Sequence, residues 1–422
     1  MIANAPPKPA SCADDFDPDA LSCEQALERI RSALKPIDAY EKLALRAALW
    51  RVLYSDLHAT ANVPPHDCSA MDGYALRGSE LSGEGASEFT LAGTALAGKP
   101  YAASLAPGQC VRIMTGGVMP IGADTVVMQE DTEITGDKVR VHPGQKPGQN
   151  VRAAGEDIAE GQCVLRAGRR LTPADLGLLA SLGVPEVPVV RRLRVAFFST
   201  GDELRSLGQP LGEGMIYDSN RYTLYAMISR IGAEPIDMGV VPDQREDLSA
   251  ALRVAAASAD AVITSGGVSV GEADYVKECL EAVGQIAFWK IAMKPGRPLA
   301  FGQIGQAWFF GLPGNPVSVM ATFYQFVQPA LRRLMGEAET PPLQLTARCL
   351  SKLRKKPGRV EFQRGILENT ADGELVVRKT GEQGSGILRS MSEANCFIVL
   401  PMDSGRVEPG ADVVVQPFAG LI

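Results

Sequence analysis

Several features that would assign this protein to a specialised class are missing from its sequence. Its 422 residues include only three histidines, and its eight cysteines are scattered without a Cys-x-x-Cys pair. That spacing disfavours a zinc site and a disulfide framework, and it fits reduced thiols in a cytosol. Any bound metal ion would therefore be held by oxygen ligands.

Long apolar runs and an excess of positive charge are also absent. No stretch of about 18 uninterrupted apolar residues occurs, so no membrane-spanning helix is expected. Residues 1–20 are rich in proline and aspartate without a secretion signal, and we expect them to form a disordered tail of a cytoplasmic protein. The formal net charge of −7 argues against a nucleic-acid partner and an acidic membrane surface.

The composition is that of a globular protein, and its length exceeds a single ordinary core. A capping box of Ser22 and Gln25 predicts a helix through Ala33. Apolar residues at helical spacing predict a second helix over 39–57. The sequence from about residue 63 to 151 has short β-type runs broken by glycine, which predicts a β-rich module. A third helix is expected in "LTPADLGLLASLG", which begins after Thr172.

The remaining sequence has two regions with different patterns of apolar residues. The runs "LRVAFFST", "ADAVITSGG" and "AWFFGLPGNP" are apolar strands that end in turns and alternate with helical patterns. This alternation is typical of a doubly wound α/β sheet of parallel strands. From about Pro341 only short strands occur, which indicates a small β-barrel or sandwich. The predicted fold class is therefore α/β plus β, in several domains.

A glycine-rich turn follows one of the predicted parallel strands, in "TSGGVSVGEAD". Ligands of open α/β sheets bind beyond the carboxyl ends of the strands. There Gly266 and Gly267 permit close backbone approach, while Ser265 and Ser269 add hydroxyl donors, so the turn suits an anion. The alternative is an ordinary tight turn between strand and helix, and the loop alone does not decide.

Charged residues cluster at the same predicted edge. Asp274, Glu203 and Asp243 follow three different elements, and carboxylates beside phosphates commonly hold a divalent cation. Each of them taken alone fits a helix cap or a solvated turn as well. Lys290 and Lys294, read as one strand, share a face about 13 Å apart. Two lysines at this spacing could bind a polyanion. Alternatively, the long side chain of Lys290 carries its ammonium group to the edge of the sheet and into solvent.

A stiff turn completes the predicted anion site. Arg297 follows Pro-Gly, and "GLPGNPVS" supplies Pro313, Asn315 and Pro316, with Ser318 in the first turn of the helix that follows. No Ser-His-Asp or Cys-His set is apparent, so covalent catalysis is not expected.

Nine strings from about Leu43 onward resemble, closely and in order, the molybdopterin molybdotransferase family, the MoeA-type enzymes that include the gephyrin E domain. They are "PPHDCSAMDGYA", "RIMTGGVMPIGADTVVMQE", "VRAAGEDI", "STGDEL", "SGGVSVGEADY", "KIAMKPGRP", "LPGNPVS", "GRVEFQRG" and "QGSGILRSMSEANCFIVL". Two departures are modest. Arg297 stands where lysine is common, and "PPHDC" differs from the usual aromatic and small polar residues.

The resemblance implies four domains and an elongated homodimer. The implied limits are 21–62 with 151–192 for a segmented N-terminal linker domain, 63–150 for the β-rich domain, 193–340 for the α/β molybdopterin-binding domain and 341–422 for the C-terminal barrel. The implied reaction, which needs Mg²⁺, transfers molybdenum from molybdate into adenylylated molybdopterin and releases AMP. The active site would lie between the α/β domain of one subunit and the other subunit.

The matching positions imply roles for individual residues. Lys294, Arg297, Ser318, Arg364 and Ser385 would contact molybdate or phosphate. The functional polar set would be Asp72, Thr115, Asp157, Glu203, Asp243, Asp274 and Lys290, with Glu203, Asp243 and Asp274 as magnesium ligands. From the residues alone, Asp72, Thr115 and Asp157 fit turn capping.

Two other functions remain open at this point. The α/β part also resembles the adenylyltransferase that acts one step earlier on molybdopterin, although the extra length and the strings "FQRG" and "GEQGSG" favour insertion. A dimeric scaffold like the gephyrin E domain is the second alternative. The adenylyltransferase and apo-molybdoenzymes are expected protein partners of the insertion enzyme.

Overall fold

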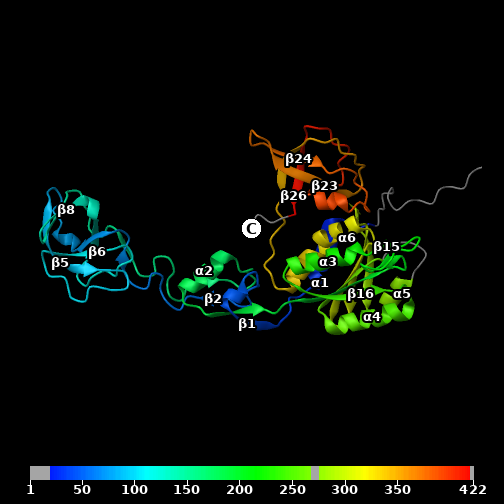
Figure 1. The fold of residues 1–422 in the computed structure, drawn as a ribbon, viewed down its shortest axis with the longest axis horizontal. Helices are drawn as coiled ribbons and strands as arrows, with labels where there is room; N and C mark the ends of the chain where they lie inside the picture. The colour runs from blue at the N-terminus through cyan, green and yellow to red at the C-terminus, as the bar shows by residue number, and fades with distance from the viewer. Residues whose placement is uncertain (1–19, 268–274, 419–422) are drawn as a thin grey trace, which may run out of the picture. The chain divides into compact units, whose positions relative to one another are not determined.

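The computed structural model describes residues 20–267 and 275–418. The chain divides into two compact units, Met1–Tyr40 with Val190–Ile422 and Glu41–Val189, and each is described by itself (Figure 1). Residues 1–19 of the predicted tail lie outside the described residues, as do Ser269 and Asp274. No helix within the described ranges is long and apolar enough to cross a membrane.

The unit Glu41–Val189 contains a six-stranded sheet in the order β7-β4-β6-β5-β9-β8. Its strands are β4 (Gly73–Leu76), β5 (Ser87–Ala95), β6 (Gln109–Ile113), β7 (Thr125–Met128), β8 (Thr132–Thr135) and β9 (Lys138–Val141). Short 3₁₀ turns, η2 (Gly78–Glu80) and η3 (Gln129–Asp131), connect some of them. Apolar side chains fill both faces, in clusters around Tyr74 and Ile113. This sheet is the predicted β-rich module.

The rest of this unit consists of two-stranded pairs and one helix. The pairs are β1 (Tyr40–Ala44) with β12 (Glu186–Val190), β2 (Leu57–His58) with β11 (Cys163–Leu165), and β3 (Cys68–Ser69) with β10 (Val151–Arg152). The helix α2 (Pro173–Ser181) begins as predicted, with a capping box between Thr172 and Asp175.

The predicted helix over 39–57 is wrong. The structure has β1, the 3₁₀ turn η1 (Leu45–Ala48) and then extended chain. Leu53 donates its N–H to the carbonyl of Arg169, and Leu45 donates to that of Pro185. Partners distant in sequence therefore take the hydrogen bonds that a helix would have used. The apolar spacing serves a small core instead, in which Leu53 packs with Leu171.

The other unit is built on a six-stranded sheet in the order β16-β13-β17-β21-β20-β18. Its strands are β13 (Arg194–Thr200), β16 (Glu234–Val241), β17 (Ala261–Ser265), β18 (Gln285–Lys290), β20 (Pro298–Ile304) and β21 (Ala307–Leu312). The first four in spatial order are parallel, and β20 and β18 add an antiparallel edge.

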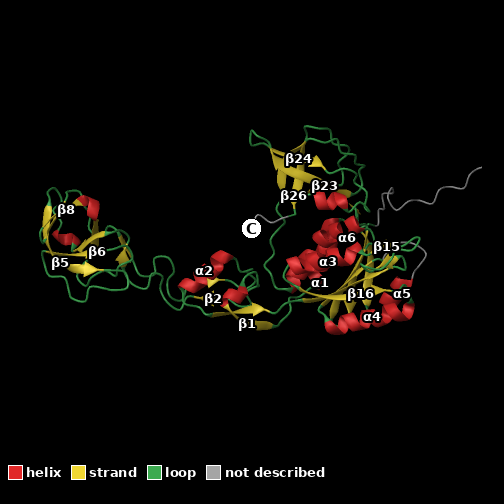
Figure 2. Cartoon of the chain, viewed as in Figure 1, coloured by secondary structure: helices red, strands yellow, loops and turns green. Residues whose placement is uncertain are grey.

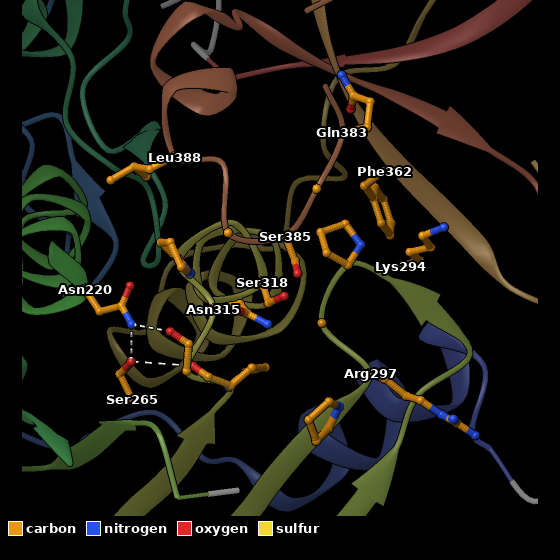
Figure 3. A pocket seen from close by; sticks show the side chains of 18 of the residues that line it. Asn220, Ser265, Lys294, Arg297, Asn315, Ser318, Phe362, Gln383, Ser385 and Leu388 are labelled. Carbon is orange, nitrogen blue, oxygen red and sulfur yellow. Dashed lines mark hydrogen bonds between the residues drawn. The ribbon is translucent and has the colours of Figure 1, made fainter. Parts of the chain in front are cut away.

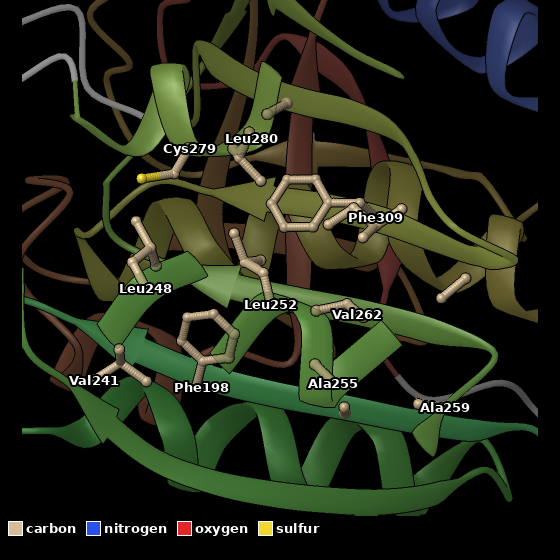
Figure 4. Close-up of a cluster of buried hydrophobic side chains, with 14 residues drawn as sticks. Phe198, Val241, Leu248, Leu252, Ala255, Ala259, Val262, Cys279, Leu280 and Phe309 are labelled. Atoms are coloured by element: carbon tan, nitrogen blue, oxygen red, sulfur yellow. The ribbon is translucent and has the colours of Figure 1, made fainter. Parts of the chain in front are cut away.

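Helices cover both faces of this sheet, as a doubly wound fold requires (Figures 1 and 2). One face carries α4 (Arg245–Ser258) and α5 (Tyr275–Val283), and the other carries α1 (Cys23–Ala33), α3 (Ser219–Arg230) and α6 (Pro316–Thr322). A π-helical segment (Phe323–Val327) joins α6 to α7 (Gln328–Leu334). Figure 4 shows Phe198, Val262 and Phe309 of the strands packed against α4, which makes this face a continuous core.

The C-terminal strands form the predicted barrel. They are β22 (Leu345–Cys349), β23 (Val360–Asn369), β24 (Leu375–Lys379), β25 (Cys396–Leu400) and β26 (Asp412–Pro417), with the short helix α8 (Arg389–Glu393). The strand order β23-β24-β22-β26-β25 closes because β23 also pairs with β25. Its apolar interior includes Leu353, Val377 and Ile398. The predicted fold class is thus confirmed.

Lys290 and Lys294 do not share one strand, which corrects that expectation. Lys290 ends β18 and pairs with Pro298 in the α/β sheet. Lys294 belongs to β19 (Met293–Lys294), which pairs with β23 of the barrel. The chain thus leaves one sheet and joins the next within three residues, because each segment finds a different hydrogen-bonding edge.

Candidate active site

A cavity of about 1800 Å³ lies beyond the carboxyl ends of β13, β17 and β21, between the sheet and the barrel. The chain leaves β13 toward β16 on one side and then crosses to β17 on the other, and ligands of such sheets bind where the strand order reverses. Many of the predicted site residues line the cavity. They are Glu203, Asp243, Ser265, Gly266, Gly267, Lys290, Lys294, Arg297, Pro313, Asn315, Pro316, Ser318, Arg364 and Ser385.

The glycine turn after β17 requires glycine for steric reasons. Gly266 has a φ of +96° and Gly267 a φ of +71°. A Cβ at Gly266 would lie 2.4 Å from the carbonyl oxygen of Thr200. The turn therefore packs directly on the end of β13, and its backbone faces the cavity.

Two of the three predicted carboxylates lie at this edge. Asp243 follows β16 and accepts a hydrogen bond from the hydroxyl of Thr200, at the end of β13. Glu203 lies so near the turn after β13 that a Cβ at Gly201 would meet its Oε2 at 2.6 Å. Oxygen donors of this kind suit a hard cation such as Mg²⁺. Within the described ranges no group of three potential ligands is assembled, and Asp274 lies outside those ranges.

The cavity has more cationic than acidic side chains. Among the described residues that line it, eight are lysine or arginine and five are aspartate or glutamate. Lys294 lies 3.9 Å from the carboxylate of Glu361, measured between Nζ and Oε1, and its side chain remains half-exposed. Figure 3 shows Lys294 and Arg297 on either side of the turn that joins them. The excess of positive charge favours an anionic ligand.

Arg364 is the most unusual cation of the cavity. Its side chain is 1% exposed, and burial lowers its pKa to about 10. Its Nε donates to the hydroxyl of Ser390 at 3.0 Å and its Nη2 to the carbonyl of Gly384 at 3.1 Å. Within the described part of the chain no carboxylate lies at ion-pair distance from it. A buried guanidinium without a counter-charge is costly unless a ligand supplies one.

The turn before α6 brings the barrel and the α/β sheet together. Ser318 is buried in the first turn of the helix, and Pro316 is its first residue, as predicted. The N–H of Val317 donates to the carbonyl of Ser385 at 3.0 Å, so a loop of the barrel bonds directly to the first turn of α6. Figure 3 shows the Ser385 and Ser318 side chains side by side over the cavity.

Sequence reasoning missed Asp218 and Asn220, which also line the cavity. Both are buried at the start of α3. The sequence indicates part of this, because Asp-Ser-Asn before a helical pattern is typical of the start of a helix. Several barrel residues were missed as well, since nothing in a set of short strands indicates which loops face a distant sheet. They are Lys352, Arg354, Arg359, Lys379, Glu382 and Gln383.

Asp72, Thr115 and Asp157 belong to the unit Glu41–Val189. Asp72 accepts hydrogen bonds from Thr115 at 2.7 Å to the backbone N–H and 2.8 Å to the hydroxyl. The N–H and then the hydroxyl of Thr115 lower the pKa of Asp72, which stays exposed. Asp157 donates its N–H to the carbonyl of Val63. The first two residues therefore form one hydrogen-bonded pair, in which Asp72 carries the charge.

Comparisons with known proteins agree with one another along the chain. Residues 21–183 match the MoeA N-terminal region (domains I and II), residues 196–333 a probable molybdopterin-binding domain, and residues 346–418 the MoeA C-terminal region (domain IV). The chain is 44% identical to a molybdopterin molybdenumtransferase of Haemophilus influenzae, over 95% of this chain and 100% of that one. It is 35% identical to gephyrin of Dictyostelium discoideum, over 88% of this chain and 58% of that one.

Solved structures give the same result. A molybdopterin biosynthesis moeA protein of Pyrococcus horikoshii OT3 superposes with a TM-score of 0.83 at 31% identity, over 94% of this chain and 100% of that one.

Proposed function

The chain belongs to the MoeA family of molybdopterin molybdenumtransferases, enzymes of molybdenum cofactor biosynthesis, and on this premise we propose the reaction of its cavity. Molybdenum from molybdate is inserted into adenylylated molybdopterin. AMP is released when water cleaves the phosphoanhydride, and the product is the molybdenum cofactor. The reaction depends on Mg²⁺.

The observation that carries this proposal is the buried guanidinium of Arg364, which lacks a counter-charge among the described residues. Molybdate is a tetrahedral oxyanion that must lose water beside an anionic substrate. A preorganised, buried cation offsets that repulsion. Ser318 and Ser385, which lie together in Figure 3, supply hydroxyl donors of the kind that an oxyanion accepts.

The other cavity residues divide the remaining work. Lys290, Lys294 and Arg297 hold the phosphates of the pterin nucleotide, and the glycine turn lets them approach the backbone closely. Pro313, Asn315 and Pro316 shape the second turn, and Ser265 anchors the first. No covalent intermediate is required, because orientation and charge are the main needs of such a transfer.

Glu203 and Asp243 would hold Mg²⁺, together with Asp274 and with Ser269 nearby in sequence. The ion supplies charge neutralisation at the phosphoanhydride when it is bound. The carboxylates themselves orient water toward the phosphorus atom, and the Thr200 hydroxyl fixes the direction of Asp243. Removal of Mg²⁺ with a chelator is expected to stop AMP release, and added Mg²⁺ to restore it.

We also propose that the enzyme works as a homodimer in which Asp72, Thr115 and Asp157 contact substrate. The four domain limits given above are part of the same proposal. Its protein partners are the adenylyltransferase that supplies the substrate and the apo-molybdoenzymes that accept the product. The adenylyltransferase alternative is not favoured, because the matches extend over all three MoeA regions. The scaffold alternative is not favoured, because charged residues predicted for the site line the cavity.

Reconstitution tests the assignment. The purified chain is incubated with adenylylated molybdopterin, molybdate and Mg²⁺, and the product is added to an apo-molybdoenzyme. Activation of that enzyme is expected, and replacement of the nucleotide substrate by molybdopterin with ATP is expected to give none. Formation of adenylylated molybdopterin and pyrophosphate in the ATP arm, without activation of the apo-enzyme, would instead identify an adenylyltransferase. The absence of both this product in the ATP arm and activation in the other arm would refute both enzymatic functions.

A further inference from the structure

We infer that Asn220 is a positioning residue that holds together the two turns of the anion site. This inference rests on the proposed function. It concerns the place where the sheet ladder ends. β17 and β21 pair in parallel up to Ser265 and Leu312, and the N–H of Gly266 donates to the Leu312 carbonyl at 3.1 Å. Beyond that bond the two chains separate into the glycine turn and the Pro313–Asn315 turn.

The amide of Asn220 bridges the two turns at this point (Figure 3). Its Nδ2 donates to the hydroxyl of Ser265 at 2.8 Å and to the carbonyl of Gly314 at 2.7 Å. The Ser265 hydroxyl in turn donates to the carbonyl of Pro313 at 3.5 Å. A single side chain from α3 thus supplies the contacts that the sheet no longer provides.

The chemistry of the partners fixes which end of the amide faces the turns. A backbone carbonyl only accepts hydrogen bonds, so the NH₂ group must face Gly314. The Ser265 hydroxyl gives its proton to Pro313 and is left as an acceptor for the second amide hydrogen. An aspartate of the same shape would therefore put oxygen against oxygen.

The start of α3, which carries Asn220, is itself fixed by hydrogen bonds. Asn220 is 9% exposed and lies in the first turn of α3, where Asp218 accepts from the N–H of Arg221. Asp218 also accepts from the hydroxyl of Ser199 on β13 at 3.0 Å. The start of α3, from which Asn220 reaches the two turns, is consequently fixed to β13.

The two turns also lie close together, which makes their spacing sensitive. A Cβ on Gly314 would lie 3.9 Å from the Cα of Gly266. One turn carries Gly267, and the other leads to Ser318. A shift of about 1 Å in the hydrogen-bond donors of an oxyanion site weakens binding and slows the reaction. The hydrogen bonds of Asn220 between these turns therefore matter more for ligand binding than for overall folding.

The test compares Asn220→Asp with Asn395→Asp in the full-length chain. Asn395 also bridges backbone groups, with 2.8 Å from its Nδ2 to the carbonyl of Leu367, but it does not line the cavity. AMP binding is measured by calorimetry, kcat and KM for adenylylated molybdopterin by AMP release, and Tm by thermal unfolding. Asn220→Ala, which removes both bonds without adding charge, serves if Asn220→Asp does not fold.

Asn220→Asp is expected to raise the Kd for AMP and the KM for the nucleotide substrate at least about tenfold, with a change in Tm no larger than that of Asn395→Asp. An unchanged Kd and KM, or equal losses in both variants, would overturn the inference. AMP binding does not require turnover. A chain that forms no cofactor yet loses AMP affinity on substitution therefore refutes the proposed function and supports the role of Asn220, whereas wild-type protein that does not bind AMP contradicts both.

Discussion

Replacement of Arg364 by methionine should weaken molybdate binding strongly while leaving the fold nearly as stable as before. Burial lowers the pKa of this guanidinium to about 10, against an ordinary value above about 12. That depression corresponds to roughly 3 kcal/mol of unfavourable desolvation, or about 2 kcal/mol after allowance for solvent in the cavity. The charge is thus a cost to the empty protein.

The hydrogen bonds lost on substitution offset about all of this gain. Arg364 donates to Ser390 and to the carbonyl of Gly384, and each such bond contributes about 1 kcal/mol. The free energy of unfolding of Arg364→Met is therefore expected to lie within about 1 kcal/mol of the wild type, because methionine fills most of the same volume. Chemical denaturation measures this value directly.

Molybdate binding responds in the opposite way. A charge-assisted contact in a buried site is worth about 3 kcal/mol, so the Kd for molybdate should rise about a hundredfold. Calorimetry on wild type, Arg364→Met and Arg378→Met measures this change. Arg378 is an exposed residue of the same barrel, 3.3 Å from Glu368, and its loss should change neither quantity. A large loss of stability with unchanged molybdate affinity would show that the guanidinium is structural and would refute the reasoning.

Further predictions concern the glycine turn, the Asp72–Thr115 pair and a distant ion pair. Gly266→Ala should cost about 1 to 3 kcal/mol of stability and most of the activity, because its Cβ would collide with the Thr200 carbonyl; normal denaturation and turnover would contradict this. Asp72→Asn should lower kcat/KM without loss of folding. Because the N–H and hydroxyl of Thr115 lower the pKa of Asp72, the pH profile of the wild-type kcat/KM should show no ionisation of Asp72 between about pH 5 and about pH 8. Burial raises the pKa of Asp260, but its hydrogen-bonded ion pair with Arg191 outweighs burial, so the pKa is lowered overall. The stabilising contribution of Asp260 is therefore present above its ordinary pKa and is lost as the pH falls below that value. Denaturation of Asp260→Asn from about pH 7 to about pH 3 should accordingly show a deficit against wild type that shrinks in acid, and a constant deficit would exclude this ion pair as its source.

Patterns that depend on neighbours in sequence predicted the fold well. The apolar strands before Gly201 and Gly266 are buried on both faces, so their composition alone indicated a parallel sheet with helices on each side. The helices begin after Ser22 and Thr172 as predicted, because their capping bonds join residues three apart. Local chemistry decided these elements.

Contacts between distant segments explain the failures. Apolar residues over 39–57 recur at helical spacing, but the N–H of Leu53 donates to the carbonyl of Arg169. No pattern of neighbouring residues predicts a hydrogen-bond partner so far along the chain. Lys290 and Lys294 lie in different sheets for the same reason. Asn220 was missed because its importance comes from Ser265 and Gly314, which lie far along the chain. The family resemblance pointed to Arg364, while its burial without a counter-charge is visible only in three dimensions.

The most direct test of the account is the stoichiometry of one reaction. Adenylylated molybdopterin, molybdate and Mg²⁺ are mixed with the enzyme, and the AMP released and the molybdenum bound to the pterin are measured in the same sample. The account predicts one AMP for each molybdenum inserted, with neither product formed when Mg²⁺ is chelated. Molybdenum insertion that leaves the adenylyl group in place, or AMP release that never yields the cofactor, would contradict it.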